Sequence, residues 1–335
     1  MVGSLFFAAR IIFVRRSYAL PKGGEAVARL RGTAALLFPV FFGAALLFFP
    51  DVSAAAAREG VTLCLQTVLP SLFPFFVLSS LLVQSDVPRL LSRAMAGVMY
   101  PLFGVSGAGA SALILGLLGG YPVGARTVAE LYGRGEIARE EAEQLLAFCN
   151  NSGPGFFLGV CGTAVFGSAR AGAYLYLIHV GAALVTGILL RRDLGLPRRK
   201  AVSRQRAPFD LAAALPAAVQ GSFAAVGSVS AFVIFFMVLL RLLSLVPALA
   251  ALPPLPRAAL FGFVEMTNGV NALPATRAGF VLCAAIMNWG GLSVQAQTRA
   301  LLAGSALSAR RCVIGKAVQA LAGVPLALLA AQRLF

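Results

Sequence analysis

Charged residues are scarce in this sequence, and acidic residues are the scarcer kind. Only 12% of its 335 residues are charged, and 12 Asp and Glu side chains stand against 28 Lys and Arg. A typical soluble domain has about 25% charged residues. The shortage of charge therefore excludes an ordinary soluble protein of this length.

Recognisable catalytic motifs are missing as well. No GxSxG elbow, Walker A loop, HExxH motif or Rossmann fingerprint occurs in a suitable context, and we expect no enzymatic activity. The single histidine, His179, lies in a plain apolar run, where a packing role is favoured over a proton relay. The cysteines form no CxxC pair, so we expect buried, reduced thiols and no metal site. They are Cys64, Cys149, Cys161, Cys283 and Cys312.

Long uncharged runs take up much of the sequence instead. They cover residues 60–83, 94–125, 144–169, 211–240 and 278–298. Several exceed the roughly 18 apolar residues that mark a transmembrane helix, and the mean hydropathy is +0.87. We predict an all-α polytopic integral membrane protein that has the lipid bilayer as a partner.

The net charge of +16 is explained by the arrangement of a polytopic membrane protein. Lys and Arg lie mainly between the apolar runs, where the positive-inside rule places them on the cytoplasmic face. We therefore expect no nucleic acid partner, although a basic membrane face could also attract an anionic solute.

Charge and hydropathy divide the chain into five segments. Residues 1–32 form a basic cytoplasmic segment, in which no cleavable signal peptide is expected and which could include an over-extended start. Residues 33–59 hold a first transmembrane helix and an outer loop, and residues 60–190 a first repeat. Residues 191–209 form a basic cytoplasmic linker, and residues 210–335 a second repeat.

The basic segments limit the number of membrane crossings. If every run between residues 33 and 190 crossed fully, the basic linker would lie outside, against the positive-inside rule. If the Gly- and Pro-rich run 94–125 is instead a re-entrant hairpin, the linker returns to the cytoplasm. Broken backbone at membrane depth is tolerated where protein or a watery cavity satisfies it. The charged stretch 127–146 is then expected to be an interfacial helical arm.

Both halves follow the same order of elements, which is a long helix, a broken hairpin, a helix interrupted by Asn and Gly, and a plain helix. Such halves would have opposite orientations in the membrane. We expect about seven transmembrane helices and two re-entrant hairpins in two inverted repeats, and paired interruptions of this kind indicate a secondary-transporter binding site.

A broken helix carries the strongest candidate site. The motif Asn-Asn-Ser-Gly-Pro-Gly at residues 150–155 interrupts the run 144–169, because proline removes a backbone donor and glycine loosens the chain. Its amide and hydroxyl groups could bind a solute, and half-helix N-termini would favour an anion. Interhelical hydrogen bonding is the alternative. Asn288 and Ser293 lie at the matching interruption of the second half.

Two charged side chains could take part. Glu265 is the only acidic residue after Asp210, and it could bind a coupling Na⁺ or H⁺, or pair with Arg257 or Arg277 near the interface. Arg126 could clamp a carboxylate or serve only as a topology signal. No cofactor is expected beyond that coupling ion. The predicted solute-binding residues are Gly120, Tyr121, Pro122, Arg126, Asn150, Asn151, Ser152, Gly153, Thr267, Asn268, Asn288 and Ser293.

Four stretches of the sequence resemble a known family. They are Leu69-Pro-Ser-Leu-Phe-Pro-Phe75, Gly119-Gly-Tyr-Pro-Val-Gly-Ala-Arg126, the charged arm 130–143, and Phe148-Cys-Asn-Asn-Ser-Gly-Pro154. Over residues 36–332 the chain is similar to the YlbJ (SpoVV) sporulation integral membrane proteins, which belong to the nucleoside-recognition, or Gate, domain group. The basic stretch before residue 32 lies outside that pattern.

The resemblance implies both a fold and a function. Gate domains are related to concentrative nucleoside transporters, whose fold has two re-entrant hairpins and two unwound helices in inverted repeats. The sporulation family is implicated in moving dipicolinic acid out of the mother cell towards the forespore, across the outer forespore membrane.

The expected function is therefore secondary transport of a small organic anion, with dipicolinate as the leading solute. The motifs of the nucleoside transporters are not reproduced here, so nucleoside specificity does not carry over. An ion-coupled carrier of nucleoside or nucleobase-like solutes stays open as an alternative, and so does a non-transporting membrane scaffold of spore assembly. A homo-oligomer is compatible with each.

Overall fold

The chain is helical, which confirms the predicted all-α class. A computed structural model describes residues 25–195 and 209–335, and no β-strand occurs in these two ranges. Most of the basic N-terminal segment and of the basic linker lies outside them. The chain divides into two compact units, residues 1–50 and residues 51–335. The described part of the first unit contains helix α1 (Glu25–Phe48).

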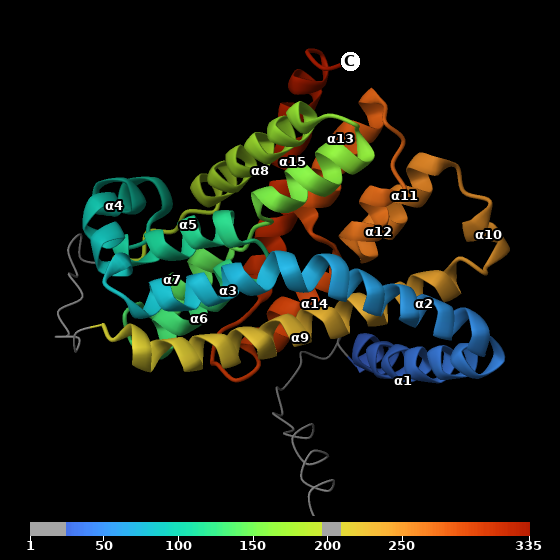
Figure 1. Ribbon diagram of the computed structural model, residues 1–335, viewed down its shortest axis with the longest axis horizontal. Coiled ribbons are helices and arrows are strands. Elements are labelled where there is room, and N and C mark those ends of the chain that lie inside the picture. Colours follow the sequence, from blue (N-terminus) through green and yellow to red (C-terminus); the bar gives the residue numbers. More distant parts are fainter. Residues whose placement is uncertain (1–24, 196–208) are drawn as a thin grey trace, which may run out of the picture. The chain divides into compact units, whose positions relative to one another are not determined.

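The second unit holds fourteen further α-helices within its described residues (Figure 1). They are α2 (Pro50–Leu63), α3 (Leu69–Gln84), α4 (Val87–Phe103), α5 (Ala110–Gly119), α6 (Val123–Gly133), α7 (Arg139–Leu146), α8 (Ala169–Leu189), α9 (Leu211–Leu243), α10 (Pro247–Ala250), α11 (Pro254–Val264), α12 (Met266–Asn271), α13 (Arg277–Trp289), α14 (Gly291–Leu302) and α15 (Arg310–Ala331). Two π-helical stretches, Cys64–Val68 and Phe156–Val165, and a short 3₁₀ turn complete the unit.

Within residues 25–195 and 209–335, four segments are long and apolar enough to cross a membrane, or up to six if two bent helix pairs are each counted as one span. The four are Ala169–Leu189, Leu211–Leu243, Arg277–Leu302 and Arg310–Leu334. Large apolar side chains such as Leu177, Leu321 and Leu329 are exposed on these segments, as contact with lipid requires. The integral membrane class is supported, while the higher number of spans that the sequence predicts is not confirmed.

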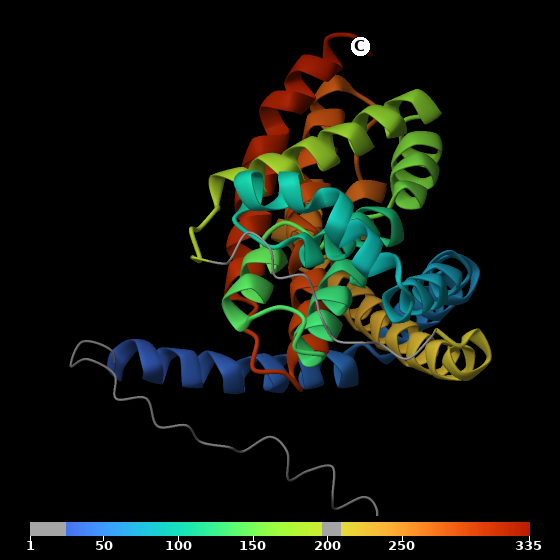
Figure 2. The same ribbon diagram turned by 90° about the vertical axis from the view of Figure 1, so that its left-hand side faces the viewer.

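Two groups of helices form the framework around the site. Helices α8, α13 and α15 pack against one another, and α3 packs along α9 (Figures 1 and 2). Phe280, Met287 and Ala327 are fully buried between the first three helices. Burial of a large apolar side chain contributes about 1.5–3 kcal/mol in water. In lipid, close packing of such side chains takes over that role.

The first hairpin extends beyond the run 94–125 in which the sequence predicts it. That run contains most of α4, which ends at Phe103, and all of α5, and this helix pair is bent by 101°. The chain then folds back between α5 and α6, which pack side by side, so the tip of the hairpin is at residues 120–122. The tip thus lies within the predicted run, whereas most of the second limb, α6, lies beyond it, because its charged residues are typical of an interfacial segment.

The predicted interfacial arm, residues 127–146, is also revised. It consists of most of α6 and all of α7, and both helices have a buried face that includes Val128, Leu131 and Leu145. Helix α7 leads directly into the Asn-Asn-Ser-Gly-Pro-Gly motif at residues 150–155, which we call the Asn-rich break. It therefore forms the first limb of the broken helix. Most charges on these helices lie on the opposite, more exposed faces, as an amphipathic pattern allows. Glu141 is the exception among them: it is buried and accepts a hydrogen bond from the backbone N–H of Ser106.

The second half follows the expected order of elements. Helix α9 is followed by the short pair α11 and α12, which meet at Glu265, and by α13 and α14, which meet at Gly290. Gly290 and Gly291 both have positive φ angles, +80° and +82°, a backbone conformation that glycine adopts without a steric penalty. An inverted symmetry between the two halves stays a prediction.

The packing of the end of α4 against the start of the basic linker yields a test of topology. Gly104, at the end of α4, lies against the backbone of Arg192, and the Tyr100 hydroxyl is 3.5 Å from Asp193 Oδ1. We expect single cysteines at Arg93 and Arg192 to react with an impermeant maleimide from the same, cytoplasmic side. Ala275, at the far end of the α13–α14 span, should react from outside. Labelling of Arg93→Cys and Arg192→Cys from opposite sides of the membrane would contradict the arrangement.

Candidate functional site

The two helix breaks, at residues 150–155 and at Gly290 and Gly291, converge with the tips of the two hairpins in the structure. A Cβ atom added to Gly120 would lie 3.0 Å from the backbone nitrogen of Gly153, so the first hairpin tip contacts the Asn-rich break. A Cβ on Gly290 would lie 3.1 Å from the hydroxyl of Tyr121, and one on Gly291 would lie 3.0 Å from the nitrogen of Met266. The contacts thus run from break to break, through the tips of both hairpins.

Polar side chains of other helices satisfy the Asn-rich break. The amide nitrogen of the Asn150 side chain donates to the Thr298 hydroxyl at 2.9 Å, and the backbone N–H of Ser152 donates to His179 Nε2 at 3.1 Å. Because a backbone N–H can only donate, Nε2 is the unprotonated nitrogen of that ring. The side-chain nitrogen of Asn151 donates to the carbonyl oxygen of Phe148, three residues earlier, at 2.8 Å. These residues are buried.

Lys316 of α15 lies within this cluster and is fully buried. Its ammonium group donates to Asn151 Oδ1 at 3.2 Å and to Gln319 Oε1 at 2.7 Å, and it sits 5.1 Å from the centroid of the Tyr121 ring. Gln319 Nε2 also donates to Asn151 Oδ1, at 3.0 Å. In the described ranges no carboxylate pairs with Lys316. The site therefore holds a basic group that no acid of the described residues neutralises.

Three buried polar atoms at the interruptions lack a hydrogen-bond partner among the described residues. They are Asn150 Oδ1, Asn288 Oδ1 and Ser293 Oγ. An unpaired buried polar atom costs about 1–3 kcal/mol, so a solute or water is expected to bind there. All three belong to residues that the sequence predicts for the site. The Asn288 side chain also packs against Gly323 of α15, so a side chain at residue 323 would collide with it.

Glu265 lies at the tip of the second hairpin and is 3% exposed. Its carboxylate accepts from the backbone nitrogen of Thr267 at 3.1 Å, from that of Asn268 at 2.8 Å, and from the Asn268 side chain at 2.8 Å. It therefore caps α12 through the exposed N–H groups of a helix N-terminus. Neither Arg257 nor Arg277 pairs with it in the described structure, so the proposed interfacial ion pair is not formed.

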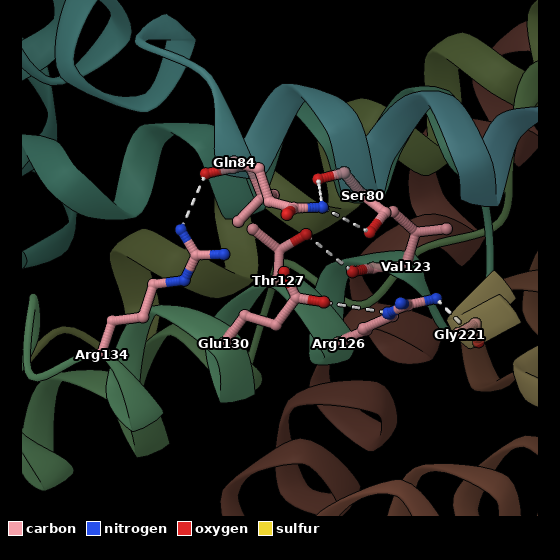
Figure 3. A network of polar contacts seen from close by, with 9 residues as sticks. Ser80, Gln84, Val123, Arg126, Thr127, Glu130, Arg134 and Gly221 are labelled. Atoms are coloured by element: carbon pink, nitrogen blue, oxygen red, sulfur yellow. Dashed lines mark hydrogen bonds and ion pairs between the residues drawn. The ribbon is translucent and has the colours of Figure 1, made fainter. Parts of the chain in front are cut away.

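Arg126 lies apart from the central cluster. Its Nε atom is 3.0 Å from Glu130 Oε1, and its Nη1 atom donates to the carbonyl oxygen of Gly221 at 3.5 Å (Figure 3). The guanidinium lines a small pocket between α3 and α6 with Ser79, Ser80 and Thr127. Its neighbours thus differ from those of Asn150 and Lys316, although it follows the hairpin tip closely in sequence.

The sequence did not point to Lys316, Gln319 or His179 as members of the site. In the sequence Lys316 resembles the basic residues that mark the cytoplasmic face, because Arg310 and Arg311 precede it by less than two helical turns. A signal was available: residues 316 and 319 are one turn apart and share a helix face. Lysine and glutamine on one face of an apolar span are costly unless they have polar partners.

The cysteines are buried and unpaired, as predicted. Cys149 lies next to the Asn-rich break, and Cys312 lies one turn before Lys316 on α15. The described residues contain no group of three or more His, Cys, Asp or Glu side chains that could hold a metal ion.

Comparison with known proteins was consistent with this architecture. The Gate family, described as "Nucleoside recognition", matches residues 65–240, which is more than half of the chain. The chain is also similar to the sporulation integral membrane protein YlbJ of Bacillus subtilis (strain 168). The two are 29% identical, and the match covers 79% of this chain and 74% of the relative. No solved structure matches the chain significantly.

A close approach between the first hairpin and the Asn-rich break gives a test of the site's geometry. A Cβ on Gly124 would collide with the carbonyl oxygen of Cys149, whereas a Cβ on Gly133 of the same helix would have no neighbour within 4 Å. We expect Gly124→Ala to lower stability by about 1–3 kcal/mol, as overpacking does, and Gly133→Ala to cause no loss. Thermal unfolding in detergent measures both, and equal stability of the two variants would contradict the predicted approach.

Proposed function

The chain belongs to the nucleoside recognition (Gate) family, and we propose that it is a secondary membrane transporter of a small organic anion. The observation that carries the proposal is Lys316, a buried ammonium group at the meeting point of the helix breaks with no carboxylate partner in the described ranges. A buried charge at membrane depth is costly. An anionic solute that binds beside it would offset that cost.

Several further features suit a solute with carboxylate groups. Asn150 and Ser152 supply amide and hydroxyl groups at the break, and the orphaned oxygens of Asn288 and Ser293 lie at the matching break. Discontinuous helices expose backbone N–H groups that favour anions. Tyr121, next to Lys316, offers an aromatic face for a planar solute.

The sporulation relative suggests the physiological setting. Its name describes it as a sporulation integral membrane protein, and we propose that this chain acts in endospore formation as well. In that setting dipicolinate, a planar pyridine with two carboxylates, is the leading solute, moved out of the mother cell towards the forespore across the outer forespore membrane. The protein would act as a carrier and not as an enzyme, and a homo-oligomer is compatible with this role.

Glu265 is our candidate for ion coupling. Its carboxylate is buried at the second hairpin tip and is held by three N–H donors. Carboxylate oxygens bind Na⁺ or accept H⁺, and the described structure gives this group no cationic side chain that would compete. We propose that Na⁺ or H⁺ binds here and links solute movement to an ion gradient.

Substitutions at the Asn-rich break test the transport function. We expect Asn150→Ala and Asn151→Ala to reduce dipicolinate uptake into proteoliposomes by about tenfold or more, because a hydrogen bond to a charged group contributes about 1.5–3 kcal/mol. Uptake of radiolabelled dipicolinate is compared with uptake of uridine. The control is Asn271→Ala, because Asn271 is exposed at the end of α12, and this variant should transport normally.

Each outcome of that experiment separates the candidate functions. Uridine uptake without dipicolinate uptake would favour the nucleoside alternative. If the wild-type protein moved neither solute, while the Asn150 and Asn151 variants still supported sporulation and accumulated normally, a scaffold role would replace transport.

Glu265→Gln tests the coupling ion. The glutamine keeps a side-chain oxygen for the cap of α12 but loses the charge. We expect uptake against a concentration gradient to be abolished and solute binding to persist. Imposed Na⁺ and pH gradients identify the ion in the wild-type protein. Glu140→Gln, at an exposed position of α7, should leave gradient-driven uptake unchanged, and concentrative uptake by Glu265→Gln would exclude this residue.

A further inference from the structure

The ammonium group of Lys316 is coordinated as a bound cation would be. Two amide oxygens, Asn151 Oδ1 at 3.2 Å and Gln319 Oε1 at 2.7 Å, and the face of the Tyr121 ring surround it. An ammonium group has three N–H donors and no acceptor, and an aromatic face attracts a cation. All its ligands are therefore neutral groups whose negative ends point at the charge.

These ligands come from separate parts of the chain. Asn151 belongs to the break between α7 and the π-helical stretch, Tyr121 to the tip of the first hairpin, and Gln319 to α15. The same Asn151 oxygen accepts from Gln319 Nε2 at 3.0 Å. The cation thus connects the hairpin tip and the broken helix to a continuous helix behind them.

We propose that Lys316 is a tethered monovalent cation, which occupies at the Asn151 break the position that a mobile cation would otherwise take. Its fixed charge holds the first hairpin tip and the broken helix together and gives the site permanent anion preference. The anion preference rests on the proposed function, whereas the cation seat does not. The seat is separate from Glu265, where the mobile coupling ion is expected.

The inference predicts a vacant cation seat when the lysine side chain is removed. In Lys316→Ala, the acceptor oxygens of Asn151 and Gln319 would face the space that the lysine side chain beyond Cβ had filled. Propylammonium consists of the atoms that this substitution removes, so it matches the seat in length and charge. Lys316→Met fills most of the same volume without a charge, and it should leave no such seat.

Thermal unfolding of the purified, full-length protein tests this directly. We expect Lys316→Ala to unfold at a temperature lower by roughly 2–4 °C for each kcal/mol that is lost, and millimolar propylammonium chloride to recover most of that shift. Wild-type protein and Lys316→Met should not respond to the amine. Arg310→Ala removes an exposed cation from the same helix and serves as the matched control. If propylammonium affected all four proteins alike, or none of them, the tethered-cation inference would be overturned.

A second variant keeps the proposal testable if Lys316→Ala fails to fold. Gln319→Glu places a carboxylate where the Gln319 oxygen now lies, 2.7 Å from the ammonium nitrogen. The new ion pair offsets the loss of the hydrogen bond that Gln319 Nε2 donates to Asn151 Oδ1, so we expect the variant to fold. It should also weaken dipicolinate binding by about tenfold or more, which corresponds to about 1.4 kcal/mol, because the positive charge is then neutralised. Unchanged dipicolinate affinity in Gln319→Glu would contradict the fixed-charge role.

The two arms distinguish failure of the inference from failure of the proposed function. If wild-type protein binds no small anion but propylammonium rescues Lys316→Ala, the cation seat is supported and the proposed anion transport is contradicted. If wild-type protein binds dipicolinate but the amine does not rescue Lys316→Ala and Gln319→Glu binds normally, transport stands and the tethered cation falls.

Discussion

The hydrogen bonds between α15 and the Asn-rich break are the interaction on which the site depends. A break in a helix frees backbone groups, and lipid cannot satisfy them. Here Lys316 and Gln319 both bind the Asn151 side chain, and His179 of α8 accepts from the Ser152 backbone. Without these partners the non-helical backbone at residues 147–153 would be too costly among apolar helices.

The shape of α15 follows from the same constraint. Gly315 lies against the carbonyl oxygen of Ala147 and Gly323 against the Asn288 side chain, so a Cβ at either position would collide. Small residues at these two points let the helix approach both breaks closely, as in other membrane interfaces. Lys316 and Gln319 lie between them and supply the polar groups. One continuous helix thus supports the discontinuities of both halves of the chain.

The sequence was most informative about backbone interruptions and least informative about their partners. Pro154 and the adjacent glycines predict the first break, and Gly290 and Gly291 predict the second. These residues cannot continue a helix without cost. The second limb of the first hairpin was not predicted, because charged residues hid the buried face of α6. Lys316 was missed because a lysine near a span end usually marks topology, and only packing shows that it points inward.

Two buried charges of opposite sign lie at different breaks, and neither forms an ion pair in the described structure. The Glu265 carboxylate is held by N–H donors, and the Lys316 ammonium by amide oxygens and an aromatic face. Neutral dipoles can stabilise a charge without cancelling its net value, whereas a partner of opposite charge would cancel it. The transport that we propose, of an anionic solute with a mobile ion, would be helped by such uncancelled charges, because an internal ion pair would have to be broken at every cycle.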